Sequence, residues 1–177
     1  MKELKEYQIP YTGLKVGIHR FEYDVDHRFF RHFEGALINE CNVKVKVEFE
    51  KKETFFIIRF FVDGTVRVEC DRCLEPFDKE IFGDYVLYVK FSDDPASLAD
   101  DDEVMYICRE DPVIDIAQAV YDYINLCIPI QVIHPKTADG HEGCNPEVLK
   151  YLRTSAHEKT DDSEVDPRWA ALKKLKD

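Results

Sequence analysis

The sequence predicts an α+β protein: an antiparallel β-meander sheet or partial barrel with one packed helix, an irregular Cys/His loop and a C-terminal helix. Several stretches alternate between apolar and polar side chains, which is the period of a strand, and one later stretch has helical spacing. Aromatic residues that favour strands are plentiful, with 12 Phe and 9 Tyr among 177 residues. Hydrophobic residues make up 45% of the chain, which is enough to bury one core.

The strands are predicted from the order of these patterns. Alternation over 17–26 and 42–50 indicates two strands with one solvated face, whereas the almost wholly apolar stretch 54–62 suits a strand covered on both faces. Asp63-Gly64 is a strong hairpin signal, so we expect a turn there. Further strands are expected over 65–70, 78–91 (bulged near Gly83) and 104–108.

The helices are predicted from capping signals. Asp111-Pro112 resembles an N-cap followed by proline at the first helical position, and apolar residues follow at helical spacing as far as Cys127. Asp166-Pro167 repeats that signal near the end of the chain. We therefore expect a single α+β domain over 1–152, with one or two helical turns at 146–152, a flexible charged linker over 153–165 and a C-terminal helix over 166–177.

Charge and hydropathy limit the classes of function. The N-terminus has no apolar signal run and no 18-residue apolar stretch occurs, so we expect a cytoplasmic protein without a membrane segment. The net charge of −12 opposes nucleic-acid binding at long range, so direct RNA contact would need a local basic patch, and a basic protein partner fits the charge more easily. The acidic stretch 92–103 is interpreted as a solvated loop in preference to a site for metal or a basic partner.

Six cysteines without a signal peptide favour free thiols or metal ligands over disulfides. Cys70 and Cys73 form a Cys-x-x-Cys motif, which can supply half of a tetrahedral zinc site because a tight turn brings both sulfurs to one point. The other half can come from His134 and Cys144, with His141 as an alternative ligand. The sequence thus offers a candidate site for one zinc ion.

Two other interpretations of the cysteine pair remain open. A redox pair normally lies at a helix N-terminus, whereas this pair ends a strand, so the redox interpretation is less favoured. Unliganded structural thiols stay as an alternative to zinc. Catalytic signals are weak, since no phosphate-binding Gly-rich loop, His-Glu-x-x-His or Gly-x-Ser-x-Gly occurs.

The stretch from Val68 to Phe77, Val-Glu-Cys-Asp-Arg-Cys-Leu-Glu-Pro-Phe, resembles the YceD family, also called large ribosomal RNA subunit accumulation proteins. The hallmark Cys-x-Arg-Cys-Leu is matched by Cys70, Arg72, Cys73 and Leu74, and Asp-Pro-Arg at 166–168 resembles the family's tail. The chain departs from the family where many members carry several cysteines after the helix. Here Cys144 remains, and by position His134 and Cys144 stand where two of those cysteines would be.

The resemblance implies a bacterial, non-catalytic factor that supports accumulation or processing of large-subunit ribosomal RNA and ribosome assembly. The implied partner is a ribosomal protein or a large-subunit precursor particle, with RNA contact indirect and no small-molecule substrate. Arg72, inside the cysteine turn, is a candidate contact to a phosphate or a partner carboxylate, the alternative being a salt bridge to Glu69, Asp71 or Glu75. The alternative function is a thiol-dependent enzyme, redox or nuclease-like, that uses the Cys-x-x-Cys pair.

Overall fold

The computed structural model describes residues 3–36, 38–94, 103–136 and 143–157. The chain divides into two compact units. The sheet unit comprises Met1–Glu69 and Pro76–Val132, and the cysteine unit comprises Cys70–Glu75 and Ile133–Asp177. The C-terminal helix expected over 166–177 and most of the linker expected over 153–165 lie outside the described residues.

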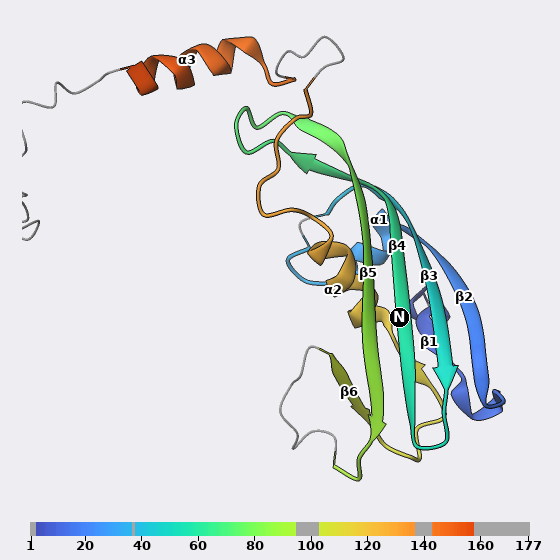
Figure 1. Ribbon diagram of the computed structural model, residues 1–177. Helices are drawn as coiled ribbons and strands as arrows, with labels where there is room; N and C mark the ends of the chain where they lie inside the picture. The colour runs from blue at the N-terminus through green and yellow to red at the C-terminus, as the bar shows by residue number, and fades with distance from the viewer. Residues whose placement is uncertain (1–2, 37, 95–102, 137–142, 158–177) are drawn as a thin grey trace, which may run out of the picture. The chain divides into compact units, whose positions relative to one another are not determined.

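An open five-stranded sheet dominates the sheet unit (Figure 1). Its order is β2-β3-β4-β5-β6, in which the first four strands are antiparallel neighbours and β6 runs parallel to β5. Among the described strands β2 and β6 are the two edges, so the sheet is not closed into a barrel. The α+β class and the antiparallel meander are confirmed. The strands are β2 (Gly17–Asp26), β3 (Cys41–Lys51), β4 (Phe55–Glu69), β5 (Pro76–Phe91) and β6 (Val104–Ile107).

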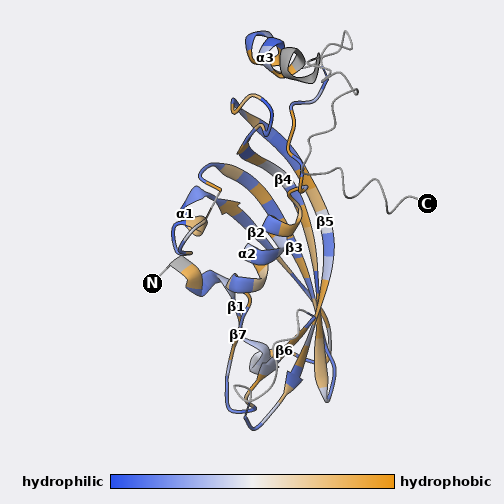
Figure 2. Ribbon diagram, turned by 90° about the vertical axis from the view of Figure 1, so that its left-hand side faces the viewer, coloured by the Kyte–Doolittle hydropathy of each residue, from blue (hydrophilic) through white to orange (hydrophobic). Residues whose placement is uncertain are grey.

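One face of this sheet carries the core. The alternation predicted for β3 places Val43, Val45, Val47 and Phe49 on the buried face, and register brings the even-numbered residues of β4 beside them. Six elements supply residues that pack on this face: η1 (Glu3–Tyr7), β1 (Gln8–Ile9), η2 (Tyr11–Gly13), α1 (His27–Phe30), β7 (Ile114–Asp115) and α2 (Ala117–Leu126). Of these, α1, α2, β1 and β7 appear together on one side of the sheet in Figure 2.

The hairpin predicted at Asp63-Gly64 is wrong, because β4 runs through both residues without a break. Gly64 pairs with Val43 on one side and Ile81 on the other. A Cβ at this position would overlap the backbone carbonyl oxygen of Asn42, so glycine here permits close approach of β3 rather than a turn. The chain instead reverses at 70–75, the segment that holds the cysteine pair.

Two further local predictions differ from the structure. The register of β4 with β5 is regular past Gly83, so no bulge forms there; this glycine leaves room for Cys127, whose Sγ would lie 2.7 Å from an added Cβ. The helix begins at Ala117 rather than beside Pro112, because Ile114 and Asp115 pair with β1 near the N-terminus. Asp111 accepts a hydrogen bond from the Cys108 N–H at 3.1 Å and closes a turn before β7.

The described helix of the cysteine unit is α3 (Pro146–His157). It covers the turns expected at 146–152 and continues through 153–157, the first part of the segment expected to be a linker. None of the helices in the described part of the chain is long and apolar enough to cross a membrane.

Candidate metal centre

The cysteine pair occupies a tight turn of the cysteine unit. The Leu74 N–H donates a hydrogen bond to the Cys70 carbonyl at 2.8 Å, and the Cys70 N–H donates to the Glu75 carbonyl at 3.1 Å. Leu74 has a φ of 60°, a left-handed conformation that a residue other than glycine adopts at some cost. The turn thereby directs the sulfurs of Cys70 and Cys73 to one side, and both side chains are buried.

The second half of the cluster comes from the chain that follows residue 132. His134 and Cys144 bring their ligand atoms to the cysteine turn, so that the four ligand atoms of Cys70, Cys73, His134 and Cys144 all lie within 4.8 Å of one another. Three of these side chains are buried and His134 is half-buried. Of the two histidines considered from the sequence, the structure therefore places His134 here; His141 lies outside the described residues.

Two of the six distances between the ligand atoms agree with the geometry of a tetrahedral zinc ion. Two sulfurs, each about 2.3 Å from zinc, lie about 3.8 Å apart at the tetrahedral angle, and a sulfur and an imidazole nitrogen lie about 3.6 Å apart. The Sγ atoms of Cys70 and Cys144 are 3.7 Å apart, and Cys73 Sγ lies 3.4 Å from His134 Nδ1. All six cysteines are free thiols. The donor set, three sulfurs and one imidazole, is one that zinc takes in structural sites.

The electrostatics of the turn favour thiolate at one of these sulfurs. Burial opposes ionisation of Cys70, but backbone hydrogen bonds from Cys73, Arg72 and His134, together with the His134 side chain, outweigh it and lower the Cys70 pKa. Burial raises the pKa of Cys144, and the neighbouring Cys70 sulfur raises it further. In the metal-free protein Cys70 and Cys144 together thus favour one negative charge over two. A divalent cation would instead favour the thiolate form of every cysteine in the cluster.

A side-chain pair that the sequence analysis did not identify supports the cluster. Asn145, directly after Cys144, donates from Nδ2 to Glu75 Oε1 at 2.7 Å, and Glu75 follows the cysteine turn. Its Oδ1 accepts a hydrogen bond from the Glu147 N–H at 2.9 Å, which caps the start of α3. The sequence Asn-Pro-Glu at 145–147 could have predicted the helix cap. The bond to Glu75 could not be predicted in this way, because it joins residues 70 positions apart in the sequence. Arg72 has an exposed side chain in the same turn.

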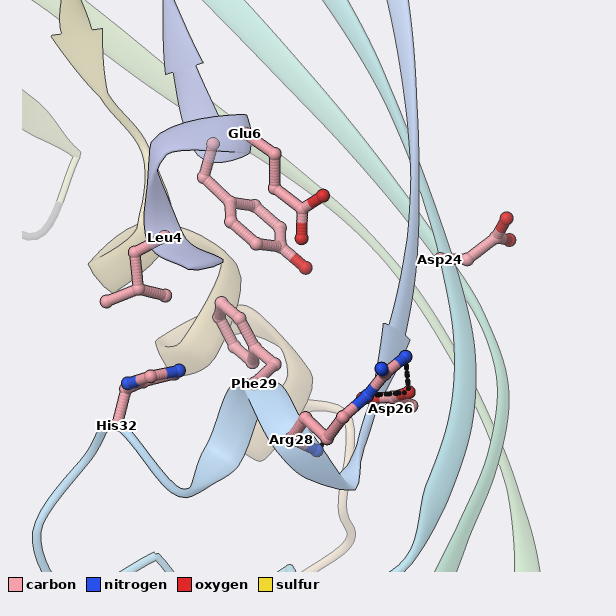
Figure 3. A pocket seen from close by; sticks show the side chains of 8 residues that line it. Leu4, Glu6, Asp24, Asp26, Arg28, Phe29 and His32 are labelled. Atoms are coloured by element: carbon pink, nitrogen blue, oxygen red, sulfur yellow. Dashed lines mark hydrogen bonds and ion pairs between the residues drawn. The ribbon is translucent and has the colours of Figure 1, made fainter. Parts of the chain in front are cut away.

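A pocket elsewhere, in the sheet unit, carries ionisable groups but no convergent set of catalytic residues. It has a volume of about 300 Å³, and Figure 3 shows the Arg28 side chain bonded to Asp26 at its edge. That ion pair is 2.7 Å long and lowers the pKa of Asp26, while Asp24 pairs with Lys44 at 3.4 Å. Two of the three carboxylates are thus already bound to cations. The lining residues are Leu4, Glu6, Tyr7, Asp24, Asp26, Arg28, Phe29 and His32.

The fold and the cluster define a class: a small α+β protein whose sheet strands β4 and β5 are joined by a Cys-x-x-Cys turn that meets a later histidine and cysteine. The sequence model of one family, described as "Large ribosomal RNA subunit accumulation protein YceD", matches residues 58–176. The match covers more than half of the chain, and the chain therefore belongs to the YceD family.

A curated relative supports this assignment. The chain is 31% identical over 144 residues to the "Uncharacterized protein YlbN" of Bacillus subtilis (strain 168), a match that covers 78% of this chain and 75% of the relative. No solved structure matches the chain. The family's description names large ribosomal RNA subunit accumulation and no catalytic activity.

Proposed function

We propose that this protein is a non-catalytic factor in the accumulation or processing of large-subunit ribosomal RNA and in ribosome assembly. The match to the family model over residues 58–176 carries the proposal, because the family is named for large ribosomal RNA subunit accumulation. The net charge of −12 supports a basic ribosomal protein, free or within a precursor of the large subunit, as the direct partner.

We further propose that Cys70, Cys73, His134 and Cys144 hold one structural zinc ion. The inter-ligand distances of 3.7 and 3.4 Å support this, as does the burial of the three cysteines. Four protein ligands would leave no open coordination position for a substrate, which favours a structural role over a catalytic one. The ion would fix the turn at 70–75 to the chain around His134 and Cys144, and so would present the exposed Arg72 in one conformation.

Sedimentation of a lysate tests the proposed role. The tagged full chain is expected to migrate with free or immature large subunits, and crosslinking in those fractions identifies the protein or RNA that it contacts. Arg72→Ala is expected to weaken the association, whereas Arg20→Ala, which removes an exposed arginine of β2, serves as the matched control. Migration of the wild-type chain only at the top of the gradient, even at low salt, would contradict the proposal.

A thiol-dependent activity is the second candidate function, and the lowered pKa of Cys70 is the observation that favours it. The same low pKa is expected of a cysteine arranged to bind a cation. Alkylation at mildly acidic pH distinguishes the two functions, because an accessible catalytic thiolate reacts fast and a buried or metal-bound sulfur reacts slowly. Fast, selective alkylation of Cys70 in protein purified without chelators would favour the enzyme; uniformly slow reaction would remove it.

A further inference from the structure

A hollow of about 600 Å³ opens in the sheet unit, beside the last residues of β5 and the first residue of β6. Its volume is in the range of small-molecule and nucleotide sites. We call it the Tyr88 hollow. It is lined by Thr54, Phe55, Tyr88, Lys90, Phe91, Val104 and Arg109.

Strand register places the central lining residues on the sheet face opposite the core. Phe55 is the partner of Lys90, and Tyr88 lies between its partners Ile57 and Val104. Their neighbours Phe56 and Val89, one residue away, are buried in the core, so Phe55, Tyr88 and Lys90 point to the other side. Directly opposed antiparallel residues have Cβ atoms about 5 Å apart, which places an aromatic ring beside an ammonium group. Tyr88 is 37% exposed, so an aromatic surface remains open to solvent.

The charged side chains that line the hollow are opposite in sign to the net charge of the whole chain. The hollow's ionisable side chains other than Tyr88 are the cations Lys90 and Arg109, and neither forms an ion pair with a described residue. The Arg109 guanidinium carbon lies 4.8 Å from the centroid of the Phe91 ring. At the rim, Lys52 Nζ lies 5.1 Å from the Phe55 ring centroid. Carboxylates also lie close to the hollow in sequence: Glu53 and Glu103 directly precede the lining residues Thr54 and Val104. The pKa of Cys108, next to Arg109, is raised by burial and then by the carboxylates Asp111, Glu110, Asp93 and Asp94.

Open aromatic surface beside cations that form no ion pair with a described residue is a combination that suits single-stranded nucleic acids. Bases stack on aromatic side chains whatever their sequence, and Lys and Arg bind the phosphates between them. A duplex keeps its base faces stacked inside, and an acidic peptide would use the cations but not the aromatic faces. A chain with net charge −12 repels a polyanion at long range, so recognition has to depend on such a local basic patch.

We propose that the Tyr88 hollow binds single-stranded RNA, with a base stacked against Tyr88 and Phe55 and the adjoining phosphates on Lys90 and Arg109. The choice of RNA rests on the proposed function. This makes the chain's RNA contact direct, in addition to any contact with a ribosomal protein, and places it on the sheet rather than at the cysteine turn.

Fluorescence anisotropy with the full chain tests this proposal. The probe is a labelled single-stranded RNA of about 12 nucleotides, compared with the same sequence as a duplex. Lys90→Ala and Arg109→Ala are each expected to weaken binding and to reduce the slope of log K against log salt by about 0.7. Tyr88→Ala is expected to weaken it about tenfold, whereas Tyr88→Phe keeps the ring and the affinity. Lys46→Ala is the matched control, since Lys46 is an exposed cation of the same sheet face, on β3.

Several results would overturn the inference: no binding of single-stranded RNA at low salt, equal binding of the duplex, or equal effects of Lys90→Ala and Lys46→Ala. Tighter binding of a polyglutamate peptide, lost in Lys90→Ala and Arg109→Ala, would assign the hollow to an acidic protein instead. A chain that binds no RNA yet migrates with large subunits contradicts this inference and keeps the proposed function. A chain that binds RNA through these residues yet stays at the top of the gradient supports the inference and contradicts the proposed function.

Discussion

Asn145 is bonded through one side chain to two different segments: its Nδ2 donates to Glu75 beside the cysteine turn, and its Oδ1 accepts from the N–H of Glu147 in α3. The residue before it is Cys144, a member of the Cys/His cluster that could hold a metal ion. The position of Cys144 is therefore coupled both to the turn that holds Cys70 and Cys73 and to the first turn of α3.

This coupling predicts different effects for two substitutions. Asn145→Ala removes the cap and the bond to Glu75, and loss of the cap alone is expected to cost about 1 kcal/mol. Asn145→Asp keeps the capping acceptor but places a carboxylate against Glu75. Amide hydrogen exchange at 147–150 is therefore expected to speed up in Asn145→Ala and to stay near wild type in Asn145→Asp, while both weaken zinc binding. Equal exchange in all three proteins would show that the cap does not hold α3.

Removal of one ligand is expected to abolish zinc binding. Cys70→Ser and Cys144→Ser each leave three of the four ligands, so zinc in protein purified without chelators is expected to fall from about one ion per chain to near zero. Chelation should lower the melting temperature of the wild-type protein, because an ion bound only by the folded chain stabilises it. It should leave the melting temperature of Cys70→Ser unchanged. Cys108→Ser is the matched control, since Cys108 is outside the cluster.

The histidine position gives a sharper test of which side chain completes the site. His134→Cys supplies a fourth sulfur, and zinc accepts four cysteines as readily as three cysteines and a histidine. This variant is expected to keep about one zinc ion per chain, whereas His134→Ala loses it. Loss of zinc in His141→Ala but not in His134→Ala would instead assign the fourth ligand to His141.

The sequence predicted the four members of this cluster, Cys70, Cys73, His134 and Cys144, and kept His141 as an alternative to His134. The Cys-x-x-Cys spacing is local and directly visible, whereas the choice between His134 and His141 depends on the path of an irregular segment that has no period. The same distinction holds in the sheet. Alternation predicted β2 with its observed bounds, but the helix start at Pro112 was wrong because β1, over 100 residues earlier, pairs with Ile114–Asp115.

Gly64, where the sequence predicted a hairpin turn and the structure has the strand β4, leads to a stability prediction. Gly64→Ala would drive a Cβ into the backbone of β3 at Asn42, which cannot move without disturbing the sheet, so we expect a loss of roughly 1–3 kcal/mol in the free energy of unfolding. Gly83→Ala meets side chains, Cys127 Sγ and Tyr85, and is expected to cost less. Cys127→Ala added to Gly83→Ala should recover part of the lost free energy of unfolding, because it removes the sulfur that the new Cβ meets. Cys127→Ala added to Gly64→Ala should recover none of it.

Gly13→Ala provides the matched control for both substitutions, because an added Cβ there has nothing within 4 Å among the residues that the structure describes. Urea unfolding of the three single glycine variants and the two double variants with Cys127→Ala measures the differences. If Gly64→Ala were no less stable than Gly13→Ala, close approach of β3 would not be the reason for glycine in β4.

The buried tyrosines near the N-terminus predict how stability changes at alkaline pH. Burial raises the pKa of Tyr23 from 10.0 to about 12, with a smaller contribution from Glu6, and burial likewise raises the pKa of Tyr7, which stacks on Tyr23 with ring centroids 5.0 Å apart. The folded chain holds these protons more tightly than the unfolded chain, so their contribution to stability is complete below pH 10 and is lost as the pH rises through about 12. Urea unfolding across that window should show that the free energy of unfolding falls as the pH rises, and Tyr23→Phe should reduce the fall.

Tyr151→Phe, at an exposed position, is the matched control and should leave the fall unchanged. An identical pH dependence in Tyr23→Phe and the wild-type protein would mean that Tyr23 ionises as readily in the folded chain as in the unfolded one.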